Sequence, residues 1–236
     1  LALPWLPPLA INHWPWLGLS LVAHLGYKIY LLRAFRLGDF SQAYPIARGS
    51  APVWVLLASL LLSTESLVAL SLAQTLGVAI VTAGIISLAP WRQVHLHRPV
   101  LVAALATGLW IASYTLIDGY MVASGATFAA YVGWLFILDG LVINVYAWYK
   151  HGGELALAYR LHWPLAALGG AFSVAAYTIS LWAMTVLPVA MVAALRETSV
   201  LAAVLLAVVW LREPLGLRQY VAATAIGTGL LLLKLV

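Results

Sequence analysis

The residues best able to do chemistry are ionisable side chains that lie within long apolar stretches of this sequence. Besides His24 there are six of them: Lys28, Arg48, Asp118, Asp139, Arg196 and Glu197. In a helix that crosses a membrane, a charged side chain costs about 2.5–3.5 kcal/mol on insertion scales, so it is kept only where it faces protein or water. Three of the six are positive and three are negative. Two interpretations follow: the charges pair internally, or some of them line a polar cavity.

The basic members of this set suit an anionic or zwitterionic ligand. A guanidinium in a dry site binds a carboxylate or phosphate through two parallel hydrogen bonds. We therefore expect Arg48, Arg196 and Lys28 to contact such a group. The alternative is an internal ion pair with Asp118 or Asp139.

The acidic residues differ in their positions along the predicted helices. Glu197 follows Arg196 directly, and adjacent helical residues point about 100° apart, so we expect each to have its own partner. Asp118 lies about one turn from the end of its helix, where we expect water to reach it, which argues against a buried proton carrier. Glu65 and Glu213 follow helices and are expected to be caps or loop anchors.

Polar and aromatic side chains recur at i, i+3 or i+4, and i+7, which puts them on one face of a helix. The three sets are Ser20, His24, Tyr27 and Lys28; Thr107, Trp110, Tyr114 and Asp118; and Ser173, Tyr177, Ser180 and Met184. In lipid such a face must point inward. The alternative is that the Ser and Thr hydroxyls bind carbonyl oxygens of their own or a neighbouring helix.

The faces and the buried charges together predict a substrate site. Its expected residues are His24, Tyr27, Lys28, Arg48, Trp110, Tyr114, Asp118, Tyr177, Arg196 and Glu197. Of these, Lys28, Tyr27, Tyr114, Tyr177 and Arg196 should converge on one cavity between two halves of the protein, with the tyrosines supplying hydrogen bonds and aromatic walls.

The composition identifies the solvent around these helices as lipid. The chain has 236 residues, of which 64% are hydrophobic and 8% charged, and its mean hydropathy is +1.01; a soluble domain carries about 25% charged residues. Cysteine is absent, which removes disulfides and thiolate nucleophiles. No basic run or Gly-rich phosphate loop occurs, so we expect neither nucleic acid nor P-loop nucleotide binding. His95 and His97 do not share a helical face, and we expect no metal site there.

Eight stretches reach the roughly 20 apolar residues that a transmembrane helix needs. They are residues 17–37, 41–62, 67–89, 100–122, 127–149, 164–187, 189–211 and 219–236. The segment 151–163 is expected to be the longest link, so no soluble domain is expected. The chain begins without Met or a basic n-region and is interpreted as part of a longer protein.

Basic residues collect in alternate links between these stretches. One side has Arg33, Arg36, Arg92, Arg98, Lys150, Arg160, Arg212 and Arg218, and the other has Lys234 alone. By the positive-inside rule the first side is cytoplasmic, which places the C-terminus outside.

An internal repeat relates the two ends of the chain. Arg48 and Glu65 are 17 positions apart, as are Arg196 and Glu213, at an offset of 148. The first three stretches thus correspond to the last three, and they cross in opposite directions, which makes the repeat inverted. We expect a five-plus-five fold lacking its first two helices, with a partial repeat at residues 1–89 and a second repeat at residues 99–236.

Three segments carry a resemblance to a known family. They are AYPIARGSAP at residues 43–52, YTLIDG at 114–119 and LRETSVLAAVLLAVVWLREP at 195–214. The chain resembles the EamA-type branch of the drug/metabolite transporter superfamily. The resemblance implies a ten-helix inverted repeat with a central cavity, often in an exporter of amino acids or other small metabolites, with both termini in the cytoplasm.

The leading hypothesis is therefore a secondary transporter that moves a small anionic or zwitterionic metabolite by alternating access, as an exporter. We expect an integral protein of the cell inner or plasma membrane, either a monomer or a homodimer. The expected partners are the substrate and the lipid bilayer, with a coupling proton left open; no cofactor, metal or catalytic residue is expected. The alternatives are a membrane-embedded enzyme acting on a lipid-linked substrate and a non-transporting scaffold.

Overall fold

The computed structural model describes residues 6–38, 40–62, 70–89, 98–200, 202 and 216–234. In this part of the chain, all regular structure is helical. The short 3-10 helix η2 (Ile11–His13) precedes eight α-helices: α1 (Trp14–Leu37), α2 (Phe40–Leu62), α4 (Leu72–Ser87), α5 (Arg98–Ala123), α6 (Phe128–His151), α7 (Gly153–Ala183), α8 (Val189–Arg196) and α10 (Leu217–Lys234). The all-helical expectation is confirmed.

Most helices begin and end close to the boundaries of the predicted apolar stretches. Among the described helices, α5, α6 and α7 are long and apolar enough to cross a membrane. Helix α4 begins later than the predicted residue 67 because Ser71 caps it. The Ser71 hydroxyl accepts from the backbone N–H of Gln74 at 3.2 Å, and the Gln74 side chain accepts from the backbone N–H of Ser71 at 2.9 Å. This reciprocal capping box satisfies two N–H groups at the start of the helix.

The predicted link at residues 151–163 was wrong, because α6 extends to His151 and α7 begins at Gly153, so residues 153–163 are helical. Residues 154–163 are mostly good helix formers such as Leu, Ala, Glu and Arg, and Glu154 in the first turn is favourable for the helix dipole. Gly152, with φ +49°, supplies the only break between α6 and α7. The aromatic and proline signals at Trp163 and Pro164 thus lie within a helix.

The chain divides into two compact units. Unit 1 contains Leu1–Leu25 and Ile117–Val186, and unit 2 contains Gly26–Leu116 and Leu187–Val236. Because the boundaries fall within α1 and α5, each of these helices contributes residues to both units.

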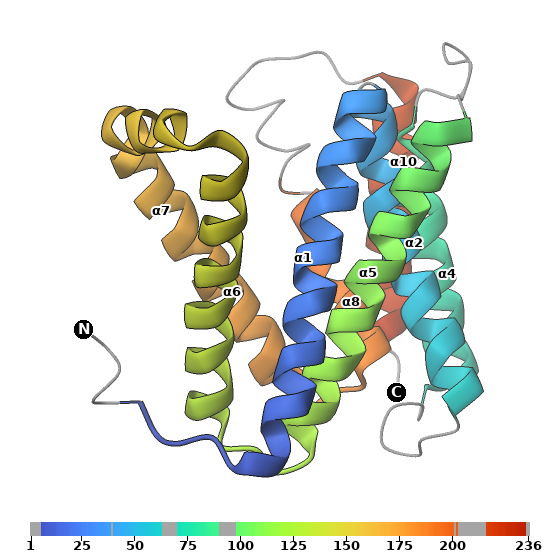
Figure 1. The fold of residues 1–236 in the computed structure, drawn as a ribbon. Helices are drawn as coiled ribbons and strands as arrows, with labels where there is room; N and C mark the ends of the chain where they lie inside the picture. The colour runs from blue at the N-terminus through green and yellow to red at the C-terminus, as the bar shows by residue number, and fades with distance from the viewer. Residues whose placement is uncertain are drawn as a thin grey trace. The chain divides into compact units, whose positions relative to one another are not determined.

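In unit 2, α4 and α10 lie side by side and approach closely (Figure 1). A Cβ atom added at Gly77 would lie 2.8 Å from the carbonyl oxygen of Gly229, and one at Gly84 would lie 3.2 Å from that of Ala222. The two helices therefore run antiparallel. Small residues on the two helices thus permit their close packing.

Another part of the core of unit 2 joins α1, α2 and α5. Ala34, Ala43, Val100 and Ala103 form one buried cluster of small and branched side chains. A second one contains Ile46, Ala47, Ala89 and Ala104. Helix α2 thus packs between its neighbours through alanines on the same face.

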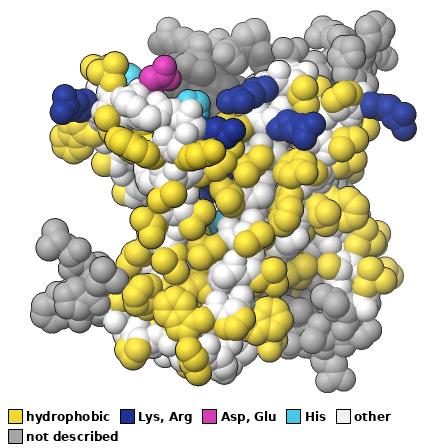
Figure 2. All heavy atoms as spheres, viewed as in Figure 1, with side chains coloured by type: hydrophobic (Ala, Val, Ile, Leu, Met, Phe, Trp, Pro, Cys, Tyr) yellow, Lys and Arg dark blue, Asp and Glu magenta, His cyan; other side chains and the backbone are white. Residues whose placement is uncertain are grey.

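Unit 1 leaves many of its large hydrophobic side chains exposed. Its packing includes the ring pair Trp14–Trp134, with centroids 5.4 Å apart, and contacts between α6 and α7. Along most of α7 the side chains are exposed, as with Leu165 and Phe172. Figure 2 shows hydrophobic side chains over much of the visible face. Such a surface is suited to lipid rather than water.

Candidate functional site

The centre of unit 1 is a carboxylate that is fully buried. Asp118 on α5 has 0% exposure. Its Oδ1 accepts hydrogen bonds from the hydroxyls of Ser20 on α1 and Tyr131 on α6, the latter at 2.6 Å. Its Oδ2 accepts one from the Tyr177 hydroxyl on α7 at 2.5 Å. We call Ser20, His24, Asp118, Tyr131 and Tyr177 the Asp118 cluster.

His24 completes this cluster from α1. Its Nδ1 lies 3.0 Å from the backbone carbonyl oxygen of Ser20, one turn earlier. A carbonyl oxygen only accepts, so this contact assigns the proton of neutral His24 to Nδ1. The other ring nitrogen, Nε2, faces Asp118 Oδ2 at 3.9 Å. The ring also packs edge-on against Tyr177, with centroids 5.7 Å apart.

The expectation that water reaches Asp118 was wrong. The position near the end of α5 is covered because Tyr131 and Tyr177 from two other helices lie over it. The sequence analysis missed Tyr131, although its spacing held a signal. Asp118 lies seven residues before Gly125, which has φ +85°, and Tyr131 lies six residues after it; two antiparallel helices joined by a short turn bring such positions together.

In unit 2 a second group of charges contains an ion pair. The Arg48 Nε on α2 donates to Glu197 Oε2 at 3.2 Å, and the side chains are 19% and 5% exposed. An Arg48 terminal nitrogen also donates to the Ser199 hydroxyl at 3.4 Å. The structure thus gives Arg48 a glutamate partner, and the alternative pairing of this arginine with Asp118 or Asp139 was wrong. Glu197 directly follows α8, so the fold brings the two charges together from distant parts of the chain.

Arg196 has different partners from Glu197, as its position one residue earlier predicts. Its guanidinium donates to the hydroxyls of Thr115 and Tyr114 on α5 at 3.4 and 3.5 Å. The guanidinium carbon lies 6.0 Å from the centroid of the Tyr114 ring, at the outer limit of a cation–π contact. We call Arg48, Arg196, Glu197, Tyr114 and Thr115 the arginine cluster. Thr115 and Ser199 are further contacts that the sequence analysis missed.

Aromatic side chains of α1 and α5 lie next to this cluster in unit 2. The Tyr27 ring packs against that of Tyr114 with centroids 5.8 Å apart. Trp110 packs on α1, where a Cβ at Gly26 would lie 2.6 Å from its ring. Trp110 thus has a clear packing role, since its ring fills the space beside a glycine. Lys28, half-buried, follows Tyr27 on α1.

The ten predicted site residues therefore belong to two groups. His24, Asp118 and Tyr177 are in unit 1, and the other seven are in unit 2. The convergence of Tyr177 with Lys28, Tyr27, Tyr114 and Arg196 on one cavity stays a prediction. Glu65, Glu213, His95 and His97 lie outside the described residues.

Several hydroxyls of the predicted polar faces bind their own helix. Thr107 donates to the carbonyl oxygen of Ala103 at 2.7 Å, and Ser180 donates to that of Ala176 at 2.9 Å. Ser173 is exposed. At Thr107 and Ser180 these bonds confirm the alternative that Ser and Thr hydroxyls bind carbonyl oxygens of their own helix. The Ser20 hydroxyl instead donates to Asp118 on another helix.

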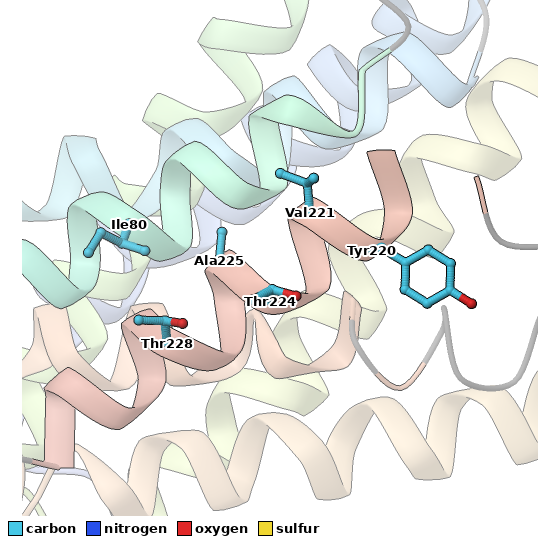
Figure 3. Close-up of a pocket in the computed structure, with 6 residues that line it drawn as sticks. All are labelled: Ile80, Tyr220, Val221, Thr224, Ala225 and Thr228. Carbon is cyan, nitrogen blue, oxygen red and sulfur yellow. The ribbon is translucent and has the colours of Figure 1, made fainter. Parts of the chain in front are cut away.

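A groove on unit 2 is lined by α4 and α10. It has a volume of about 420 Å³ and is lined by Ile80, Tyr220, Val221, Thr224, Ala225 and Thr228 (Figure 3). None of these six side chains is charged, and none belongs to the predicted site. The groove therefore has no charged side chain to balance an anionic group.

These features define an all-helical membrane protein that buries polar and charged side chains between its helices. Residues 98–235 match the model of the EamA-like transporter family. The match covers more than half of the chain, which therefore belongs to the EamA-like transporter family, and it is a membrane transporter of the drug/metabolite transporter type. A search of curated proteins found no match.

Proposed function

We propose that the chain is part of a secondary carrier that binds a small anionic or zwitterionic metabolite, such as an amino acid, through Arg196. The observation that carries the proposal is the setting of this guanidinium in a transporter that is otherwise poor in charge. Arg196 is half-buried, and its guanidinium donates to the hydroxyls of Thr115 and Tyr114 at 3.4 and 3.5 Å. A guanidinium beside hydroxyl groups can bind a substrate carboxylate through two parallel charged hydrogen bonds.

The two guanidinium groups of the arginine cluster have different proposed roles. Glu197 fixes Arg48 and balances its charge, so Arg48 supports the shape of the cluster. Tyr114 and Thr115 present hydroxyls that can accept from a substrate ammonium or donate to its carboxylate. A group with a carboxylate and an amine would find partners for both in this cluster.

Alternating access between inverted repeats is the mechanism we propose for this carrier, with export as the direction that the resemblance favours. The antiparallel packing of α4 and α10 supports the repeat, because the proposed repeat pairs these two helices and they meet at small residues in opposite directions. The membrane that holds the protein is proposed to be the inner or plasma membrane.

The test is ligand-induced stabilisation of the purified chain in detergent by a panel of amino acids and small carboxylates. We expect Arg196→Gln to weaken the binding of a compound that stabilises the parent by about 30-fold or more, since losing a desolvated charge contact costs about 2–5 kcal/mol. Arg196→Lys should recover only part of it, because an ammonium cannot bind a carboxylate with a planar fork.

The matched control is Arg33→Gln, which removes an exposed arginine of α1 and should leave the affinity unchanged. Lys28→Gln tests the second predicted cation in the same assay. Parental affinity in a folded Arg196→Gln variant would overturn the proposed role of this residue, and uptake into proteoliposomes would then show whether another part of the chain binds the compound.

A further inference from the structure

Two polar side-chain atoms in the interior of unit 2 have no hydrogen-bond partner within the described part of the chain. They are Nε1 of Trp54 on α2 and Oγ1 of Thr82 on α4. Thr82 is 5% exposed, so its hydroxyl has left water or lipid headgroups without gaining a bond. Thr107, which is also buried, donates to the carbonyl oxygen of Ala103 at 2.7 Å. A buried hydroxyl without a bond raises the free energy of the conformation that encloses it.

The position of Thr82 follows from the packing of α2 against α4. A Cβ added at Gly49 of α2 would lie 2.7 Å from Ile86 Cγ1 of α4. Leu56, two turns further along α2, packs against the buried cluster that contains Val78 of α4. The two helices therefore run antiparallel in this contact. Thr82 is four residues from both Val78 and Ile86, so it lies midway along the same face of α4.

Pro52 lies at the corresponding place on α2, midway between Gly49 and Leu56, and it is buried. A proline has no N–H, so Pro52 cannot donate to the carbonyl oxygen of Arg48, four residues earlier. In a helix, that carbonyl points along the axis toward Pro52. A carbonyl that lacks its helical donor and a hydroxyl that lacks a partner thus lie at the same level of the two helices. Threonine side chains of neighbouring helices are one means of satisfying such carbonyls in membranes.

Arg48 links this level of α2 to the arginine cluster. Its side chain donates to Glu197 Oε2 at 3.2 Å, and its backbone carbonyl is the one that Pro52 leaves without a helical donor. Proline is a common cause of helix bending. A change in the bend of α2 at Pro52 therefore moves the guanidinium that Glu197 binds.

We propose that Thr82 is a positioning residue that stabilises a second shape of α2, with a different bend at Pro52, in which its hydroxyl donates to the carbonyl oxygen of Arg48. In the structure the hydroxyl is enclosed without a bond, and in the second shape both groups are satisfied. The hydroxyl thereby brings the two shapes close in free energy, and each shape places Arg48 differently. The part that these shapes take in transport rests on the carrier function proposed above, whereas the bend itself does not.

The direct test is the distance between two spin labels on the full chain in lipid bilayers. The sequence has no cysteine, so Leu32→Cys on α1 and Leu61→Cys on α2 provide unique attachment points, and both positions are exposed. Helix α1 shares a buried cluster with the first half of α2, whereas Leu61 lies after Pro52. The distance therefore reports the bend. We expect two distances in the parent, and a single one would overturn the proposal.

The role of the hydroxyl is tested with Thr82→Val, which replaces it with a methyl group of similar size. We expect the ratio of the second distance to the first to fall about tenfold or more, because one shape loses a bond and the other loses an unpaired group. Thr82→Ser keeps the hydroxyl and should keep both distances. Thr107→Val is the matched control and should leave the ratio unchanged. Equal ratios in the parent and in Thr82→Val would overturn the proposal.

The role of the proline is tested with Pro52→Ala, which gives α2 an N–H that can donate to the Arg48 carbonyl oxygen. We expect the first distance alone, and no further effect of Thr82→Val in this background. A second distance that persists in Pro52→Ala would overturn the proposal. If Pro52→Ala does not fold, the comparison of Thr82→Val with Thr82→Ser still decides.

The unfolding free energy separates this role from a purely structural one. Thr82→Val should be at least as stable as the parent, because it removes a buried group that has no bond in the structure. Denaturation in mixed micelles measures this. A clear loss of stability would show that the hydroxyl already stabilises the enclosed conformation, and it would overturn the proposal.

The link to transport is tested by exchange across proteoliposomes of a compound that stabilises the parent. We expect Thr82→Val to slow exchange about tenfold, in step with its second distance, and Thr82→Ser to keep the parental rate. A parental rate in Thr82→Val would overturn the part of Thr82 in transport. If no compound binds, the carrier proposal fails, and the label distances still decide on the bend.

Discussion

The two polar clusters handle buried charge in opposite ways. In unit 1, Asp118 is completely enclosed and accepts hydrogen bonds of 2.5 and 2.6 Å from two tyrosines. In unit 2, Arg196 is half-buried and contacts hydroxyls at 3.4 and 3.5 Å. A fully enclosed carboxylate that hydroxyls from other helices surround is held in place, whereas a half-buried guanidinium stays within reach of a ligand. The difference teaches that burial, rather than the presence of a charge, separates a fixed group from one able to accept a ligand.

The largest effect should come from breaking the ion pair within the arginine cluster. Glu197→Ala leaves the Arg48 guanidinium without its carboxylate, and we expect a loss of about 3 kcal/mol in the free energy of unfolding, at the lower end for buried pairs because Arg48 is 19% exposed. Denaturation in mixed micelles measures this value. The double variant Arg48→Met, Glu197→Met should recover much of the loss; an equally unstable double variant would contradict this account of the pair.

The enclosed cluster should be sensitive to the loss of a single hydroxyl. Tyr131→Phe removes the bond to Asp118 Oδ1, and we expect a loss of about 1.5–3 kcal/mol, as for a hydrogen bond to a charged group. Tyr159→Phe is the matched control in unit 1, because its hydroxyl donates to Asn144 at an exposed position. Equal unfolding free energies for the two variants would mean that enclosure does not strengthen the Asp118 cluster.

The cost of adding a methyl group to a helical glycine tests how closely the helices of the two units pack. A Cβ at Gly229 of unit 2 would lie 2.7 Å from the carbonyl oxygen of Gly77 and 2.9 Å from the backbone nitrogen of Val81. Gly229→Ala should therefore destabilise by about 1–3 kcal/mol. Beyond their own helices, no described atom lies within 4 Å of a Cβ at Gly227 on α10 or Gly169 on α7.

Gly227→Ala and Gly169→Ala are the controls. Each should leave the free energy of unfolding unchanged or raise it by up to about 1 kcal/mol, because alanine is a better helix former than glycine. The three variants are compared in one denaturation series. A Gly229→Ala variant as stable as Gly227→Ala would show that α4 and α10 can move apart without cost.

The smallest effect is expected at Ser180 of unit 1. Its hydroxyl donates to the carbonyl oxygen of Ala176 on its own helix, so Ser180→Ala should change the unfolding free energy by less than about 0.5 kcal/mol. It should also leave ligand affinity unchanged in the stabilisation assay. A clear loss of affinity would assign this part of the predicted polar face to the substrate.

The sequence was sufficient to predict most of the helices and their lipid environment, and it singled out several of the residues that form the clusters. Composition and the length of apolar stretches depend on local chemistry alone, and a charge that must be buried is conspicuous in such a sequence. The family match and the helical structure confirm the fold class and the membrane localisation. The inverted repeat and the sidedness of the membrane stay predictions.

The hydrogen-bond and ion-pair partners of the candidate site residues were harder to predict than the candidate residues themselves. The sequence offered two aspartates as partners for Arg48, but the fold places Glu197 next to it, because the choice depends on how α2 and α8 pack. For Asp118, a position near a helix end suggested water, and two tyrosines on other helices exclude it. Spacing along one helix cannot reveal what another helix places over it.

The length of α7 has a consequence for the bilayer itself. At 1.5 Å per residue, the 31 residues of Gly153–Ala183 extend over about 46 Å, whereas the hydrocarbon layer is about 30 Å thick. The excess corresponds to the segment before Pro164, which carries Glu154, Arg160 and His162. We therefore expect this segment to lie among the headgroups, with Trp163 at the boundary. A bilayer of different thickness would change how much of α7 is immersed, so lipid chain length becomes a variable that can tilt or bend this helix at its proline.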